Sequence, residues 1–141
     1  MAQRIFALGE KLPLRRHRSL RDQIERAALS VSNNIAVGFE RGTTQELLTF
    51  LYIARGPAGE VRSMLCLMER MAAFENLKSE ISNLKSLAES ISRQLRGWAE
   101  KMQDSSIRGQ RYLTSKTRGI EQARRERETF LEELKAMQQK S

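Results

Sequence analysis

Apolar residues in the second half of the chain recur at alternating spacings of four and three residues, without a slip, from Leu77 to Met102. This spacing places their side chains on one face of an α-helix, and so long a seam is typical of helix bundles and coiled coils. The seam consists of Leu77, Ile81, Leu84, Ala88, Ile91, Leu95, Trp98 and Met102. Because the chain has two prolines and long stretches without a turn signal, a β-sandwich or barrel is disfavoured.

Two further long helices are predicted upstream of this seam. The first carries an apolar row from Leu20 to Ile35, and Ser19 is its expected N-cap. The second begins at Thr43, which forms a capping box with Glu46. Its apolar residues form two rows, and two rows indicate that the helix is buried on more than one side. The second of these rows is Leu48, Ile53, Met64, Leu67 and Met71.

The two prolines mark expected interruptions. Pro13 is predicted to end a short first helix that begins near Met1, and a basic connector follows at residues 14–19. Gly56 and Pro57 lie in the middle of the predicted helix that begins at Thr43. Proline lacks an amide donor and clashes with the carbonyl four residues before it, so we expect a kink there or a break into two helices.

A charged amphipathic segment ends the chain, and it is expected either to project from the bundle or to pack on a partner. Its helical face consists of Ile120, Ala123, Arg127, Phe130, Leu134 and Met137.

The predicted fold is therefore all-α. Residues 1–104 form an up-down antiparallel four-helix bundle with a short first helix, and residues 105–141 form a basic helical tail.

Charge is unevenly distributed along the chain. The net charge is +8, with +4 in residues 1–42, zero in residues 43–104 and +4 in residues 105–141. The neutral middle indicates a scaffold, and the two basic ends indicate surfaces for acidic partners. Nucleic-acid phosphates are the commonest such partner, although incidental basic charge is the plain alternative.

The residues that support catalysis or metal binding are scarce. The single histidine, His17, lies among arginines and is expected to be a solvated connector residue; the single cysteine, Cys66, is expected to be a packed core thiol. One histidine cannot supply the Glu-x-x-His pairs of a di-iron bundle, or a zinc site. We predict no catalytic residue, no metal and no cofactor, and the protein is not expected to be an enzyme.

The same scarcity bears on the compartment. One cysteine allows no internal disulfide, which fits a reducing cytoplasm. No segment approaches the roughly 20 apolar residues of a membrane span, so no membrane partner is expected.

Polar residues at fixed places within the apolar helices carry a family resemblance. The stretches from Gln23 to Arg41 and from Glu46 to Glu60 resemble the four-helix-bundle family named for the 23S rRNA intervening-sequence protein. The matching residues are Arg26, Ser30, Asn34, Gly38, Arg41, Glu46, Gly56 and Glu60. This sequence departs from the family pattern at Val37, at Pro57 and in a shorter first helix. The match is close from Leu20 to Met71 and extends to Met102 by pattern only.

The resemblance implies an assembly and a set of partners. It implies an up-down bundle that forms a barrel-like homopentamer, from a family encoded within rRNA intervening sequences. Relatives that serve as accessory variability determinants of diversity-generating retroelements bind the reverse transcriptase and nucleic acid.

Two groups of residues are candidate sites. A nucleic-acid surface is predicted because arginine forks match phosphate geometry. An interleaved aromatic, Tyr112, is expected either to stack on a base or to pack against Trp98. Its residues are Arg15, Arg16, Arg18, Arg21, Arg41, Arg108, Arg111, Lys116 and Arg118. Arg26, Asn34 and Glu60 are predicted to form a buried polar network that fixes helix register, or instead an oligomer contact or a ligand site.

Three functions follow from these features. The first is a non-catalytic oligomer that binds RNA or single-stranded DNA. The second is an accessory subunit that docks on a reverse transcriptase and its template RNA. The third is a structural interaction scaffold whose basic charge is incidental.

Overall fold

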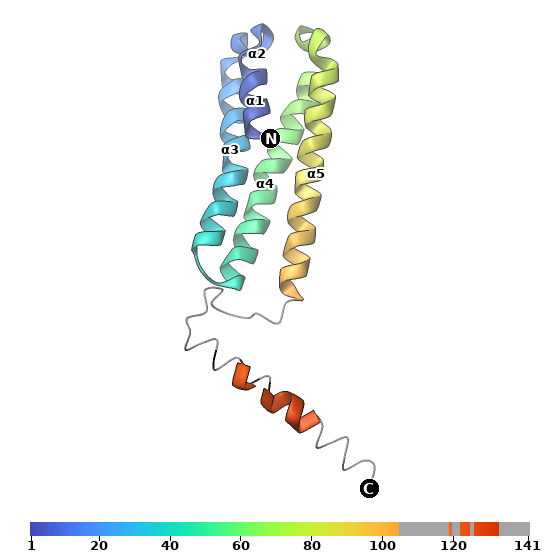
Figure 1. The fold of residues 1–141 in the computed structure, drawn as a ribbon. Coiled ribbons are helices and arrows are strands. Elements are labelled where there is room, and N and C mark those ends of the chain that lie inside the picture. The colour runs from blue at the N-terminus through green and yellow to red at the C-terminus, as the bar shows by residue number, and fades with distance from the viewer. Residues whose placement is uncertain (105–118, 120–121, 125, 133–141) are drawn as a thin grey trace. The chain divides into compact units, whose positions relative to one another are not determined.

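Helices make up all the regular elements that the structure describes (Figure 1). The structure is a computed structural model that describes residues 1–104, 119, 122–124 and 126–132. The elements in chain order are α1 (Ala2–Gly9), α2 (Leu12–Arg16), α3 (Arg18–Glu40), α4 (Thr44–Glu69), the 3₁₀-helix η1 (Ala72–Leu77) and α5 (Lys78–Gln103). The all-α prediction is confirmed.

Three long helices form the body of the protein. The chain divides into two compact units, Met1–Gly109 and Gln110–Ser141. In the first unit α4 packs against both α3 and α5, and the three helices alternate in direction (Figure 1). The much shorter α1 packs on α3 and ends in the turn that leads to α2. The sequence predicts four helices of which the first is short, and the first unit has the three long helices α3, α4 and α5 and the short α1.

The core consists of two clusters. The end of the bundle that holds α1, α2 and η1, here called the closed half, buries Ile5, Leu8, Leu14, Ile24, Ala27, Ala28, Val61, Met64, Leu65, Met68, Phe74, Ile81, Leu84 and Ala88. The end near the turn between α3 and α4, here called the open half, buries Val31, Leu47, Leu48, Leu51, Ala54, Ala58, Leu95 and Ala99. The closed half thus has the larger core, and only its core draws on α1.

Pro13 begins a helix instead of ending one. It occupies the first turn of α2, so part of the predicted basic connector is helical. Proline suits this position because its fixed φ is already helical and a first-turn amide has no partner within the helix. The Ser19 cap is also wrong: α3 begins at Arg18, its N-cap is His17, and no side chain caps it.

α4 continues through Pro57 without the predicted break. Because Pro57 has no amide hydrogen, the carbonyl of Ile53, four residues earlier, lacks its helical hydrogen bond. Ile53 is exposed. At the start of this helix the predicted capping box is confirmed. The Thr43 hydroxyl accepts a hydrogen bond from the Glu46 amide at 3.2 Å and donates one to the Glu46 carboxylate at 2.6 Å.

α3 and α4 approach each other closely in the open half. A Cβ at Gly38 would lie 2.5 Å from the Cβ of Phe50, so only glycine fits there without a shift of the helices. Gly42, in the turn that follows, has a φ of 83°, a left-handed conformation that favours glycine.

The predicted seam of α5 faces the core over most of its length. Ile81, Leu84, Ala88 and Leu95 are buried. Trp98 departs from the prediction, because 36% of this residue is exposed. The unit therefore leaves its largest seam side chain partly uncovered in the open half.

The C-terminal unit is helical at residues 119, 122–124 and 126–132, and all of these residues are exposed. Arg124 lies 3.8 Å from Glu128 one turn later. The tail is helical, as predicted, at the residues the structure describes. No helix among the described residues is long and apolar enough to cross a membrane.

Candidate nucleic-acid interface

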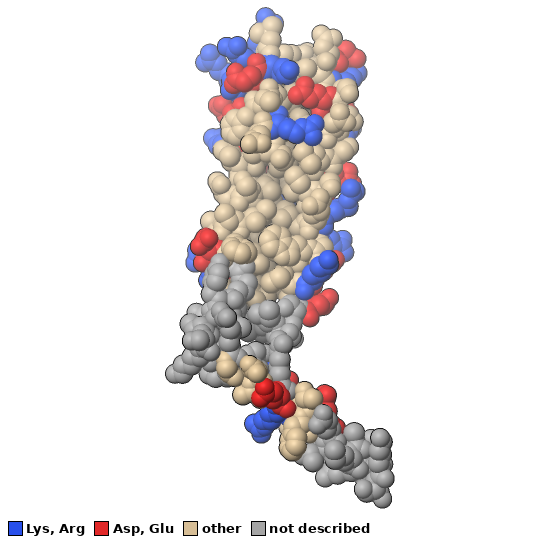
Figure 2. All heavy atoms as spheres, in the orientation of Figure 1, with Lys and Arg blue, Asp and Glu red and all other residues tan. Residues whose placement is uncertain are grey.

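A basic hollow lies at the closed end of the bundle. α2 carries Arg15 and Arg16 in its last turn, and α3 begins at Arg18 immediately afterwards. With Leu12, Arg21 and Asp22 these residues line a surface hollow of about 530 Å³. Figure 2 shows Lys and Arg side chains gathered at this end of the molecule, where α2 and the start of α3 lie. Sequence neighbours thus become spatial neighbours around one cavity.

Arg21 is held by two carboxylates at the edge of this hollow. Its Nη2 lies 2.6 Å from Oε1 of Glu10, and its Nε lies 2.9 Å from Oε1 of Glu25. The hydrogen bond with Glu25 and the negative charge of both glutamates raise the pKa of Arg21. Arg21 therefore ties α1 to α3, and its charge is largely compensated.

Arg15, Arg16 and Arg18 form no ion pair with any described residue, and all three are exposed. Their guanidinium groups remain free to contact an anion. Asp22 is the only carboxylate among the residues that line the hollow, so arginines outnumber acidic residues in the lining.

Arg41 is the other predicted nucleic-acid residue that the structure describes, and it is not brought to this hollow. Arg41 caps the opposite end of α3, and the 23 residues of that helix span about 35 Å. Its guanidinium lies 4.0 Å from the Glu46 carboxylate and 5.6 Å from the centre of the Phe50 ring. The remaining predicted residues, Arg108, Arg111, Lys116 and Arg118, lie outside the described residues.

Arg26 and Glu60 share a shallow hollow between α3 and α4, with Gln23, Ser30 and Pro57 nearby. Both are exposed, and no hydrogen bond or ion pair among the described residues joins them. Asn34 donates to the carbonyl and the hydroxyl of Ser30 on its own helix, at 2.8 and 3.0 Å.

The prediction of a buried network within one chain is therefore wrong. Arg26 and Glu60 stand on the outer surface of the α3–α4 pair, where a charged side chain can stay hydrated. A contact between subunits, or a ligand site, stays a prediction for these residues.

The burial of His17 and of Cys66 also differs from the prediction, which expected a solvated histidine and a packed core thiol. His17 is packed: its ring meets the edge of Phe74 with centroids 5.6 Å apart. Cys66 is half-buried. Within the described part of the chain, no three His, Cys, Asp or Glu side chains form a group that could hold a metal ion.

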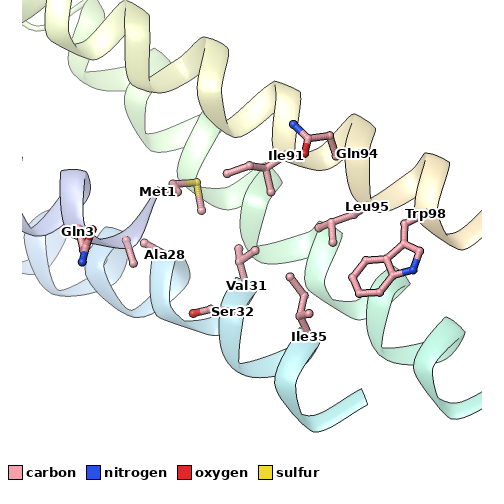
Figure 3. A pocket seen from close by; sticks show the side chains of 11 residues that line it. Met1, Gln3, Ala28, Val31, Ser32, Ile35, Ile91, Gln94, Leu95 and Trp98 are labelled. Atoms are coloured by element: carbon pink, nitrogen blue, oxygen red, sulfur yellow. The ribbon is translucent and has the colours of Figure 1, made fainter. Parts of the chain in front are cut away.

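The open half contains an apolar groove that was not predicted from the sequence. α1 packs on α3 in the closed half, and no helix of the described part of the first unit lies over α3 and α5 in the open half (Figure 1). The groove has a volume of about 560 Å³. Figure 3 shows its lining: Met1, Gln3, Ala28, Val31, Ser32, Ile35, Ile91, Gln94, Leu95 and Trp98.

The fold and the basic hollow define a small helical protein with a hollow lined by four arginines at one end. The family model of the 23S rRNA-intervening sequence protein matches residues 1–97, and this chain belongs to that family. The match spans α1 to most of α5 and leaves the tail outside. No curated protein and no solved structure matches the chain.

Proposed function

We propose that this protein is a non-catalytic oligomer that binds nucleic acid, and that the basic hollow at its closed end contacts the phosphates. The observation that carries the proposal is that Arg15, Arg16 and Arg18 line one hollow and form no ion pair with any residue that the structure describes. A guanidinium presents a planar fork of donors that matches the geometry of phosphate oxygens.

The lining of the hollow bears on how much sequence it can read. No aromatic side chain lines it, so stacking on a base has no platform there. Contacts to phosphate alone position a strand without reading its sequence. We therefore propose binding to RNA or single-stranded DNA with little sequence preference at this end.

Assembly is proposed from a second surface, the outer face of α4. Ile53 is 47% exposed and Leu67 is 53% exposed. Glu60 lies midway between them, and a spacing of seven residues keeps all three on one helix face. A Cβ added to Gly56 on this face would meet nothing within 4 Å, which leaves room for a neighbouring backbone.

We propose that this face joins copies of the chain into a closed ring, and that the ring is the homopentamer implied by the family resemblance. The predicted up-down four-helix bundle would be its subunit. Because each basic hollow then repeats once per subunit, weak single contacts with phosphate add up to strong binding.

Docking on a reverse transcriptase as an accessory subunit is a second candidate. The tail favours it, because residues 105–141 lie beyond the family match and carry nine Lys and Arg against five Asp and Glu. Co-purification with the enzyme by full-length protein, lost when the tail is removed, would support this function over the simpler one.

The test of the main proposal is a fluorescence-anisotropy titration with labelled RNA and single-stranded DNA of mixed sequence. The variant R15E/R16E/R18E should lose most of its affinity. The matched control, R62E/R93E/K101E, reverses three exposed cations outside the hollow and should bind nearly as tightly as the wild type. Equal affinities of the two variants would move the site away from the closed end.

The ring is tested separately by light scattering. I53D/L67D places two charges on the outer face of α4 and should turn the oligomer into a folded monomer. A wild-type protein that is monomeric at micromolar concentration would overturn the assembly proposal and leave the phosphate contacts untouched.

A further inference from the structure

Arg21 differs from the other three arginines of the basic hollow. It lines the hollow with Arg15, Arg16 and Arg18, but among the residues that the structure describes it is the one that pairs with carboxylates. Its side chain is 29% exposed, so a ligand in the hollow can reach its guanidinium. Figure 2 shows acidic side chains among the Lys and Arg side chains at this end of the molecule. The two carboxylates on Arg21 therefore decide how it can contact phosphate.

Glu25 holds the inner nitrogen of this guanidinium. It lies one turn after Arg21 on α3, and its Oε1 accepts a hydrogen bond from Nε at 2.9 Å. The Glu25 side chain is 16% exposed. α1 passes directly against it, since a Cβ added at Gly9 would lie 2.3 Å from the same Oε1. Because its surroundings are this close, Glu25 fixes the direction of the guanidinium.

Glu10 holds an outer nitrogen of the guanidinium and is far more open to water. It is the C-cap of α1, and its side chain is 67% exposed. Its Oε1 accepts a hydrogen bond from Nη2 of Arg21 at 2.6 Å. Arginine carries one N–H on Nε and two on each terminal nitrogen, so Glu10 takes one terminal donor and leaves the others. Neither Glu10 nor Glu25 lines the hollow, whereas Arg21 does.

We propose that phosphate displaces Glu10 from Arg21 when nucleic acid binds, and that Glu25 holds the guanidinium at the hollow during the exchange. This inference rests on the proposed function, because the hollow must bind nucleic acid for it to hold. A phosphate oxygen can replace the Glu10 oxygen on Nη2, since both are anionic acceptors, and the Glu10 carboxylate then returns to water. Arg21 thus becomes a fourth phosphate contact beside the three unpaired arginines. Glu10 competes with nucleic acid, whereas Glu25 is a positioning residue.

The two ion pairs of Arg21 differ in how easily they exchange. An exposed ion pair is weak because water competes for both charges, so Glu10 releases Arg21 at little cost. The pair with Glu25 is less screened because α1 shields that carboxylate from water, and it persists in the complex. Removal of either carboxylate makes the closed end more positive. Charge alone therefore predicts tighter binding after both removals, whereas competition at Glu10 and positioning by Glu25 predict opposite effects.

The test uses the full-length protein and labelled single-stranded RNA of mixed sequence in an anisotropy titration. E10Q should bind at least about threefold more tightly than the wild type, a gain within the range of one exposed ion pair. E25A should bind at least about threefold more weakly, although it too removes a negative charge. E25Q should restore binding, because its amide oxygen can still accept from Nε. The matched control E75Q removes a carboxylate that is 64% exposed, paired with Lys78 and outside the hollow, and should change the affinity by less than about twofold.

A second measurement shows whether the effects pass through Arg21. R21Q should make the slope of log affinity against log salt shallower by about 0.7, the value of one phosphate contact on a single strand. In the R21Q background, E10Q should no longer increase the affinity, because the group for which Glu10 competes is gone. A purely structural role of Arg21 would leave the salt slope unchanged. Circular dichroism checks that R21Q and E25A keep the helix content of the wild type, and the comparison of E10Q with E75Q decides the question if they do not.

Equal affinities of E10Q and E75Q, or a folded E25A variant that binds as tightly as the wild type, would overturn the inference. The proposed function is judged separately by the triple charge reversal of the three unpaired arginines, which should lose affinity whether or not Glu10 competes. Loss of affinity in that triple variant, together with no gain in E10Q, would leave the proposed function standing and this inference rejected. Full affinity of the triple variant would overturn both.

Discussion

The two halves of the bundle are built from the same three long helices, yet they differ in what covers them. The closed half buries 14 residues, among them Phe74, and α1, α2 and η1 contribute to it. The open half buries eight residues, three of them alanines, and all eight come from α3, α4 and α5. Burial of apolar area is the main source of stability, so the closed half contributes more to holding the fold together than the open half.

The proposed function follows the same division. The basic hollow is built on the closed half, where the ion pair of Arg21 with Glu10 joins the end of α1 to α3. Arginines on a well-packed support can contact phosphates without first being ordered, which lowers the cost of binding. The open half carries the groove and an exposed Trp98 instead.

The largest expected effect compares the same substitution in the two halves. Leu84 and Leu95 both belong to the α5 seam and are both buried, one in each half. We expect Leu84→Ala to lower the free energy of unfolding by about 4 kcal/mol and Leu95→Ala by about 2 kcal/mol, because residues around the groove can relax into the space. Urea denaturation measures both losses; equal losses would show that the halves do not differ in packing.

A smaller effect is expected where α3 and α4 touch. Gly38→Ala places a Cβ 2.5 Å from that of Phe50, and the helices must move apart, at a cost of about 1–3 kcal/mol. Gly97→Ala, in α5, meets nothing within 4 Å and should stabilise the protein by up to about 1 kcal/mol. Thermal denaturation gives both signs, and a destabilising Gly97→Ala would contradict the open surroundings of that residue.

The smallest effect concerns the helix starts. Thr43→Ala removes the cap of α4 in the open half and should cost about 1 kcal/mol. Ser19→Ala should change stability by less than about 0.5 kcal/mol, because Ser19 makes no cap at the start of α3. The same denaturation assay compares Thr43→Ala with Ser19→Ala. A loss of stability at Ser19 larger than about 0.5 kcal/mol would indicate that Ser19 does cap α3, as its position in the sequence suggests.

Local patterns in the sequence predicted the long helices well. The seam from Leu77 to Met102, the apolar row of α3 and the Thr43 cap depend on neighbours within one helix, and the structure confirms them. The start of α2 at Pro13 was missed because a proline can open a helix as well as end one.

Features that depend on how two helices pack against each other could not be predicted from the sequence. Whether Arg26 and Glu60 are buried depends on the rotation of α3 against α4, which the apolar spacing fixes only roughly. The groove depends on the length of α1 relative to α3 and α5 in space. The basic cluster at Arg15, Arg16 and Arg18 could be predicted because those residues are neighbours in the chain, whereas the distance from Arg41 could not.

The most direct test of phosphate binding at the closed end is the salt dependence of affinity. Each phosphate contact adds about 0.7 to the slope of log affinity against log salt for a single strand. For wild-type protein on single-stranded RNA we expect a steep negative slope, and for R15E/R16E/R18E a slope shallower by at least about 2, which corresponds to the three lost contacts. Identical slopes for the two proteins, or no salt dependence in the wild type, would contradict the central claim.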